Sequence, residues 1–277
     1  MSWVQIENKV IYIQADHEIA VYGLNKEQFS TDGFLVYPTD VIGYEYYTVS
    51  HSPTNSYTLF ALASKFDNTH ITIKFPKGQD SIPLNIQYDS RVFTNNDTLN
   101  ITLNAFQSFQ CLSYDKADLT GTHIISDMPI AAFSGNVRTW VGSETSRDHL
   151  ATQLPPVQAY GKVFPVVPTP ARTVGDIVRV ISSTPNTQIV VENLFSSTFS
   201  LPLPGSHVDF EIATNVSTTV TSNEPVLVVQ IAQSQQRSTN EKADPTMLVV
   251  TSITQYMSDF VFSTPQYHSE GSFSFII

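Results

Sequence analysis

Residues 129–133 (PIAAF), 225–229 (PVLVV) and 18–22 (EIAVY) decide the fold, because they are three versions of one apolar stretch. The copies start at offsets of 111 (129 minus 18) and 96 (225 minus 129) residues. A turn-forming residue stands two places before each copy, namely Asp16, Asp127 and Asn223. Each copy therefore predicts a turn followed by a buried strand, and together they predict a fold built from internal repeats.

The repeat extends beyond these stretches. Residues 38–46 and 68–71 match residues 156–164 and 186–189 at a constant offset of 118 (156 minus 38). At the offset of 96, Asp148 matches Asp244, Phe164 matches Phe260, and residues 175–181 match residues 271–277. A unit of about a hundred residues is too long for a solenoid repeat and suits a small β-sandwich or a comparable module.

Short strands follow one another along the chain, rich in β-branched and aromatic residues and separated by Asn, Asp, Pro, Gly and Ser. In residues 69–73 and 99–103 polar and apolar positions alternate, which predicts one face on a core and one in water. No window shows helical periodicity with capping signals at both ends. The sequence predicts an all-β, antiparallel protein with strands at residues 10–14, 19–22, 58–63, 70–75, 99–103, 177–181, 187–191 and 225–231.

The repeats divide the chain into four predicted parts. Residues 30–146 and 147–243 are two β-sandwich-like repeats, residues 244–277 begin a truncated third repeat, and residues 1–29 supply terminal strands that complete a partial unit. Two outcomes stay open. Either the N-terminal and C-terminal strands pair and close the third unit, or open edge strands remain and favour self-association.

Composition excludes several classes of protein. The net charge of −11 repels phosphate backbones, so no nucleic acid is expected as a partner. The longest apolar run, residues 226–229, is far too short to span a membrane, and the first residues lack the pattern of a signal peptide. Cys111 is the single cysteine, so it is either a buried inert thiol or part of an interchain disulfide.

The sequence contains no strong catalytic, cofactor or metal motif, and its seven histidines are scattered singly. The best hydrolytic combination is Ser146, Asp148 and His149, with Ser134 from a nearby stretch. Neighbouring residues of a strand point to opposite faces, so Asp148 and His149 are not expected to form the orienting pair of a triad. A structural role is favoured, in which Asp148 caps a turn and His149 donates to a backbone carbonyl.

Six stretches follow one another in order: residues 30–39 (STDGFLVYPT), 118–124 (DLTGTHI), 131–136 (AAFSGN), 148–150 (DHL), 153–157 (QLPPV) and 244–247 (DPTM). Together they resemble the N-terminal domain family of IgG Fc-binding proteins. The resemblance covers nearly the whole chain. It implies an extracellular module associated with mucus or matrix, although the truncated third unit departs from the usual length and no residue set for Fc binding can be named.

The expected function is therefore adhesion or scaffolding through a protein or glycan partner, without catalysis and without a cofactor. Tyr44, Tyr57, Asp148 and His149 are the candidate partner contacts. A carbohydrate-binding module is the alternative and predicts an exposed aromatic platform. A hydrolase using His149 is the remote alternative and requires a deep cleft around that residue. Sequons at Asn96, Asn100 and Asn215 are candidate N-glycosylation sites.

Overall fold

The computed structural model describes residues 4–27, 30–52, 56–77, 82–113, 117–142, 146–234 and 244–259. These residues form β-strands and two short 3₁₀ turns, η1 (Val157–Ala159) and η2 (Ile253–Gln255), and no α-helix occurs among them. No helix long and apolar enough to cross a bilayer is present in this described part. The prediction of an all-β antiparallel protein is confirmed.

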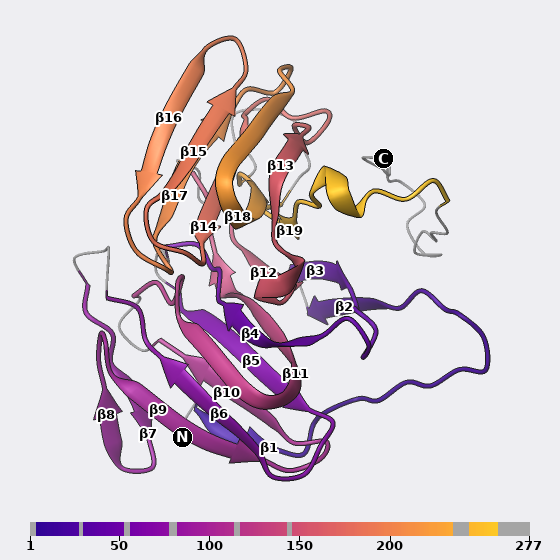
Figure 1. The fold of residues 1–277 in the computed structure, drawn as a ribbon, viewed down its shortest axis with the longest axis vertical. Coiled ribbons are helices and arrows are strands. Elements are labelled where there is room, and N and C mark those ends of the chain that lie inside the picture. The colour runs from indigo at the N-terminus through magenta and orange to yellow at the C-terminus, as the bar shows by residue number, and fades with distance from the viewer. Residues whose placement is uncertain are drawn as a thin grey trace.

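Two large antiparallel sheets lie one above the other in Figure 1. The lower sheet is built around the long strand β11 (His123–Thr139), which pairs with β4, β5, β6 and β12. The other strands of this sheet are β1 (Gln5–Glu7), β4 (Gly43–Tyr47), β5 (Thr58–Ser64), β6 (Thr69–Lys74), β9 (Thr98–Leu103), β10 (Ser108–Leu112) and β12 (Asp148–Gln153).

The upper sheet repeats this plan around a second long strand, β18 (Thr218–Ala232). Its other strands are β13 (Gly161–Val166), β14 (Asp176–Ser182), β15 (Thr187–Glu192), β16 (Ser196–Leu201), β17 (His207–Ile212) and β19 (Met247–Val249). Two hairpins stand apart from the large sheets: β2 (Tyr22–Glu27) with β3 (Ser30–Leu35), and β7 (Ile86–Tyr88) with β8 (Arg91–Phe93).

The lower sheet is called the first module and the upper sheet the second module. Equivalent strands pair in the same register in both, which confirms the predicted internal repeat. Phe133 lies opposite Gln153 in the first module, and Val229 lies opposite Val249 in the second, both shifted by 96 residues. Strands β5 and β14 are shifted by 118 residues over their full lengths, as the sequence offset predicts. The two modules therefore share one strand topology.

Each module is one bent sheet, so the predicted β-sandwich is corrected to a near-barrel and a half-barrel. The physical reason is a corner in each long strand, where the register shifts between Ile125 and Ile130 and between Thr221 and Val226. One half of the strand pairs into one wall and the other half into the next, so no separate second sheet is needed.

Asp127 and Asn223 occupy these corners. The Asp127 carboxylate accepts a hydrogen bond from the backbone N–H of His70 at 2.8 Å, and the Asn223 side chain accepts one from Gln188 at 2.7 Å. His70 and Gln188 are themselves related by the offset of 118. The turns predicted before residues 129–133 and 225–229 are therefore corners inside the continuous strands β11 and β18, at equivalent places in the two modules.

The second half of β18 lies between two cores. Leu227, Val229 and Ile231 belong to the core of the first module, whereas Val226 and Val228 belong to that of the second. Because successive side chains of a strand point to opposite faces, a strand buried on both sides needs apolar residues at every position. This explains why residues 225–229 are apolar throughout.

The N-terminal strand predictions are wrong in part. Residues 10–14 form no strand, and of residues 19–22 only Tyr22 belongs to one, at the start of β2. Ile11, Ile13 and Ile19 are 85%, 54% and 56% exposed, so no described strand covers them. The expected closure of the third unit involves residues 260–277, which lie outside the described residues. Figure 1 shows the N-terminal segment before β2 extending to one side as a long loop.

Cys111 is fully buried in β10 and has a free thiol. Burial raises the pKa of this thiol, so the reactive thiolate is disfavoured. The structure therefore agrees with the inert buried thiol and not with an interchain disulfide.

Candidate functional site at the module junction

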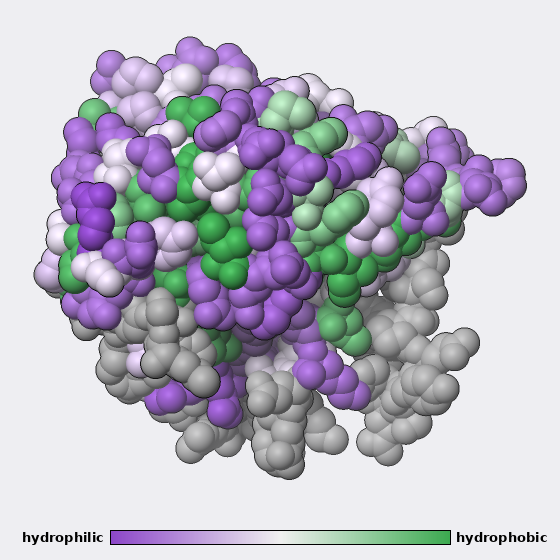
Figure 2. Space-filling view, turned by 90° about the horizontal axis from the view of Figure 1, so that it is seen from below, coloured by the Kyte–Doolittle hydropathy of each residue, from purple (hydrophilic) through white to green (hydrophobic). Residues whose placement is uncertain are grey.

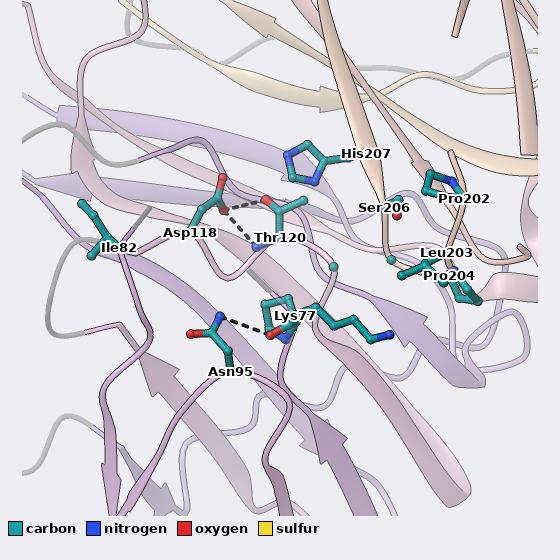
Figure 3. Close-up of a pocket in the computed structure, with 13 residues that line it drawn as sticks. Lys77, Ile82, Asn95, Asp118, Thr120, Pro202, Leu203, Pro204, Ser206 and His207 are labelled. Atoms are coloured by element: carbon teal, nitrogen blue, oxygen red, sulfur yellow. Dashed lines mark hydrogen bonds between the residues drawn. The ribbon is translucent and has the colours of Figure 1, made fainter. Parts of the chain in front are cut away.

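A shallow pocket of ≈ 220 Å³ opens where the two modules meet (Figure 3). Three segments line it: the segment that carries the β7–β8 hairpin of the first module, the loop before β11, and the loop before β17 in the second module. The lining residues are Pro76, Lys77, Ile82, Asn95, Asp118, Thr120, Gly121, Pro202, Leu203, Pro204, Gly205, Ser206 and His207.

Beneath this pocket, Arg179 of β14 joins the two modules. Residues at alternate positions of β14 face the junction, so Arg179 reaches the first module while Val178 and Val180 fill the core of the second. Its side chain is only 2% exposed. Arg179 was not predicted as a site residue, although a single charged residue within the apolar stretch 177–181 (IVRVI) is a sequence signal for this site.

The guanidinium of Arg179 is held by both modules. It donates to Asp118 at 2.8 Å and to Thr120 at 2.8 Å, and it also donates to the backbone carbonyl of Ser50. On the other side, Nε and Nη2 donate to the two carboxylate oxygens of Asp209, each at 2.7 Å. This two-pronged contact matches the fork of the guanidinium to the carboxylate.

The charges of this cluster are set by burial and by the ion pairs. Burial alone would raise the pKa of Asp118, but Arg179 and the hydrogen bonds of Thr120 hold it well below its usual range. Burial would likewise lower the pKa of Arg179, and Asp118 and Asp209 raise it above its usual value. The cluster is therefore fully ionised around neutral pH, and the Asp118 carboxylate is occupied by Arg179, Ser50, Ser52 and Thr120.

Two histidines flank the cluster. Burial, followed by the charge of Arg179, lowers the pKa of His51 and of His207 to about 4. The Nδ1 atom of each ring is buried and has no hydrogen-bond partner among the described residues. Both rings are therefore neutral at pH 7. The junction holds the two modules together, and its carboxylates are already engaged in ion pairs and hydrogen bonds.

This arrangement predicts a stability that rises with pH between 4.5 and 7. His51 and His207 take up protons near pH 6.5 when unfolded and only near 4 when folded, so the unfolded state binds more protons in this window. Burial raises the pKa of Asp32 from 3.8 to about 6, so the folded state binds one more proton at this carboxyl in the same window. This offsets part of the contribution of the two histidines. We expect roughly 2–3 kcal/mol more stability at pH 7 than at pH 4.5.

Urea unfolding followed by tryptophan fluorescence at the two pH values measures this difference. The double variant His51→Gln with His207→Gln should reverse the sign of the slope, because Asp32, whose pKa is raised to about 6, then makes the main contribution in this pH window. Equal stability of the unmodified protein at pH 4.5 and pH 7 would contradict the assignment.

Asp148 and His149 of the hydrolytic combination have separate hydrogen-bond partners in the structure. Asp148 is buried and accepts hydrogen bonds from the Ser30 hydroxyl and from the Thr31 backbone at 2.9 Å. The His149 ring lies 3.2 Å from the carbonyl of Val137 and 3.1 Å from the Asn25 amide. The structural role is thus what the geometry shows for both residues, and burial removes Asp148 from the residues that a partner could touch.

The predicted aromatic contacts lie apart. Tyr44 is 49% exposed on β4, and Tyr57, before β5, is 42% exposed. Their strands pair with opposite halves of β11, so the two rings do not form one platform. Tyr46 is fully buried, with its hydroxyl donating to the Ile130 carbonyl at 2.7 Å. The candidate glycosylation residues Asn96, Asn100 and Asn215 are all exposed.

An exposed apolar pair was not predicted from the sequence. Leu194 and Phe195 are 74% and 80% exposed in the turn that joins β15 to β16. The two strands of this hairpin pair over six consecutive positions, which holds the turn in place. Apolar side chains also reach the surface in patches between hydrophilic ones on the face drawn in Figure 2. Two large apolar residues at a hairpin tip are a candidate contact for a macromolecule.

The described residues contain no group of three or more side chains that could hold a metal ion.

Comparison with known proteins gives a consistent family. The sequence model described as IgGFc binding protein matches residues 32–277. The chain is also similar to the human protein named IgGFc-binding protein, with 25% identity over 167 residues, which are 60% of this chain and 3% of that protein. No solved structure matches.

Proposed function

The chain belongs to the IgGFc-binding protein family, and from this premise we propose that it is a non-catalytic extracellular module that binds a protein or glycan partner within a mucus or matrix layer. The chain spans only 3% of the length of its human relative, so the proposal concerns this module alone. The three exposed sequons are consistent with passage through a secretory pathway.

The exposed pair Leu194 and Phe195 is the observation on which the proposal rests. Interfaces gain most of their energy from a few apolar or aromatic anchors that become buried on contact. Burying a Leu or a Phe side chain contributes about 1.5–3 kcal/mol each. The paired hairpin presents both side chains in a fixed position, so little ordering entropy is lost on binding. Tyr44, Tyr57 and His149 remain proposed as additional contacts.

Binding assays on the immobilised chain test this proposal, with purified mucin glycoprotein, deglycosylated mucin and IgG Fc fragment as probes. We expect saturable binding to mucin that weakens about 10-fold or more in the double variant Leu194→Ser with Phe195→Ser. The matched control is Val92→Ser, because Val92 is also exposed, at 59%, but lies on the β7–β8 hairpin.

The probes separate the alternatives. Retained affinity for deglycosylated mucin indicates a protein partner, and its loss indicates a glycan partner and the lectin-like alternative. If none of the three probes binds saturably, or if Val92→Ser weakens binding as much as the tip variant, the proposed contact is wrong.

A further inference from the structure

The β2–β3 hairpin is a third copy of the strand pair that closes each module. Tyr22 lies opposite Leu35, just as Phe133 lies opposite Gln153 and Val229 opposite Val249. The shift from β2 to β11 is 111 residues and the shift from β3 to β12 is 118, the offsets that the sequence shows. The hairpin therefore has the geometry of the end of a module.

One neighbour of this hairpin is missing among the described residues. In the complete modules the long strand is paired on both sides, β11 with β5 and β12, and β18 with β14 and β19. Among the described residues, strand β2 pairs with β3 alone. The strand that would correspond to β5 and β14 is absent from the described part of the chain.

Burial shows the same gap. Leu24 is 57% exposed, whereas its counterpart in β18, Ile231, is fully buried. Tyr22 is 51% exposed, against 0% for Val229. Further upstream, Ile13 is 54% exposed, and its counterpart Val220 is fully buried. These side chains occupy core positions of the repeat and are about half exposed instead of buried.

The end of the chain contains a segment that matches the missing strand. The turn η2 lies 96 residues after η1, and η1 leads directly into the first strand of the second module. The same offset places residues 271–277 (GSFSFII) on residues 175–181 (GDIVRVI), which form β14 and the residue before it. In a register taken from β14, Phe273 and Phe275 would stand at the positions of Ile177 and Arg179.

We propose that residues 272–277 of the same chain add to the free edge of β2 and close a third module together with the β2–β3 hairpin. Arg179 lies opposite Val229, and Ile177 lies opposite Ile231. Transferring this register puts Phe275 opposite Tyr22 and Phe273 opposite Leu24. The occupant is thus apolar at the positions where the N-terminal segment exposes apolar side chains.

The hairpin is already attached to the region from which this segment departs. Asp32 of β3 accepts hydrogen bonds from the Thr246 hydroxyl at 2.8 Å and from the Ala151 backbone at 2.8 Å. Thr246 directly precedes β19, and η2 follows that strand. Since the two partners are held near each other, closure within one chain costs less entropy than recruitment of a second chain.

Cysteine cross-linking of the full chain tests the register. Under mild oxidation, Tyr22→Cys with Phe275→Cys should form an intrachain disulfide in most molecules, identified by peptide mass mapping. Tyr22→Cys with Phe273→Cys is the matched control, because it is two residues out of register and should cross-link at least about fivefold less. Cys111 is buried and can stay.

Two results would overturn the proposal. A disulfide found only between chains would assign the edge to a second copy, and equal yields for both cysteine pairs would show that no fixed register exists. A variant that does not depend on cysteine chemistry is Phe275→Asp, which should speed amide hydrogen exchange in β2 at least about tenfold and leave β11 unchanged. Unaltered exchange in β2 would also refute the closure.

Discussion

Replacing Arg179 with Met is expected to lower the free energy of unfolding by about 3–5 kcal/mol, because it leaves Asp118 as an uncompensated buried charge. The side chain of Asp118 is 2% exposed, so solvent screens its charge only weakly. Met keeps most of the volume and apolar stem of Arg, which limits the effect to the loss of charge and hydrogen bonds. Urea unfolding at pH 7 measures the change.

Two further variants separate the parts of the ion network. Asp209 is 36% exposed, so Asp209→Asn should cost clearly less than Arg179→Met, since solvent screens that side of the network. Combining Asp118→Asn with Arg179→Met removes the unpaired charge and should recover part of the loss. A loss below about 1 kcal/mol for Arg179→Met would show that the modules do not depend on this contact.

The register of the modules could be predicted from the sequence because strand pairing preserves spacing. When a strand pair recurs in a second copy, all residues of one strand shift by one constant number. Ile130 pairs with Ser64 in the first module, and the residues shifted by 96 and by 118, Val226 and Ser182, pair in the second. The offset between the two copies also falls along the chain, from 118 residues before the middle of the module to 96 residues at its end. It implies that the first module is longer by 22 residues (118 minus 96), and the β7–β8 hairpin lies in this longer part.

The junction could not be predicted in the same way. Asp118 and Arg179 are 61 residues apart and belong to different copies, so the repeat relates neither residue to the other. The counterpart of Arg179 in the first module is Ala61, which shows that the ion pairs arose from the contact between modules and not from the module plan. The prediction of a buried strand at residues 18–22 was wrong for a related reason, because a strand needs a pairing partner and the local sequence does not show whether one is present.

Gly121→Ala is expected to cost about 3 kcal/mol, the sum of backbone strain and a clash across the junction. Gly121 has φ +83°, a left-handed conformation that a side chain disfavours by about 1–2 kcal/mol. Its Cβ would also overlap the carbonyl oxygen of Gly205 in the second module. Backbone cannot move aside as a flexible side chain can, so the modules would have to separate.

Gly142→Ala is the matched control, because Gly142 has nearly the same φ, +81°, but its Cβ would meet the flexible side chain of Gln233. The difference in unfolding free energy between the two variants isolates the clash between modules, which we expect to be at least about 1 kcal/mol. Equal losses would place the whole effect in local strain. Because Gly121 and Arg179 act on the same junction, combining Gly121→Ala with Arg179→Met should cost less than the sum of the two single losses. Additive losses would mean instead that the ion network and the glycine contact hold the two modules independently.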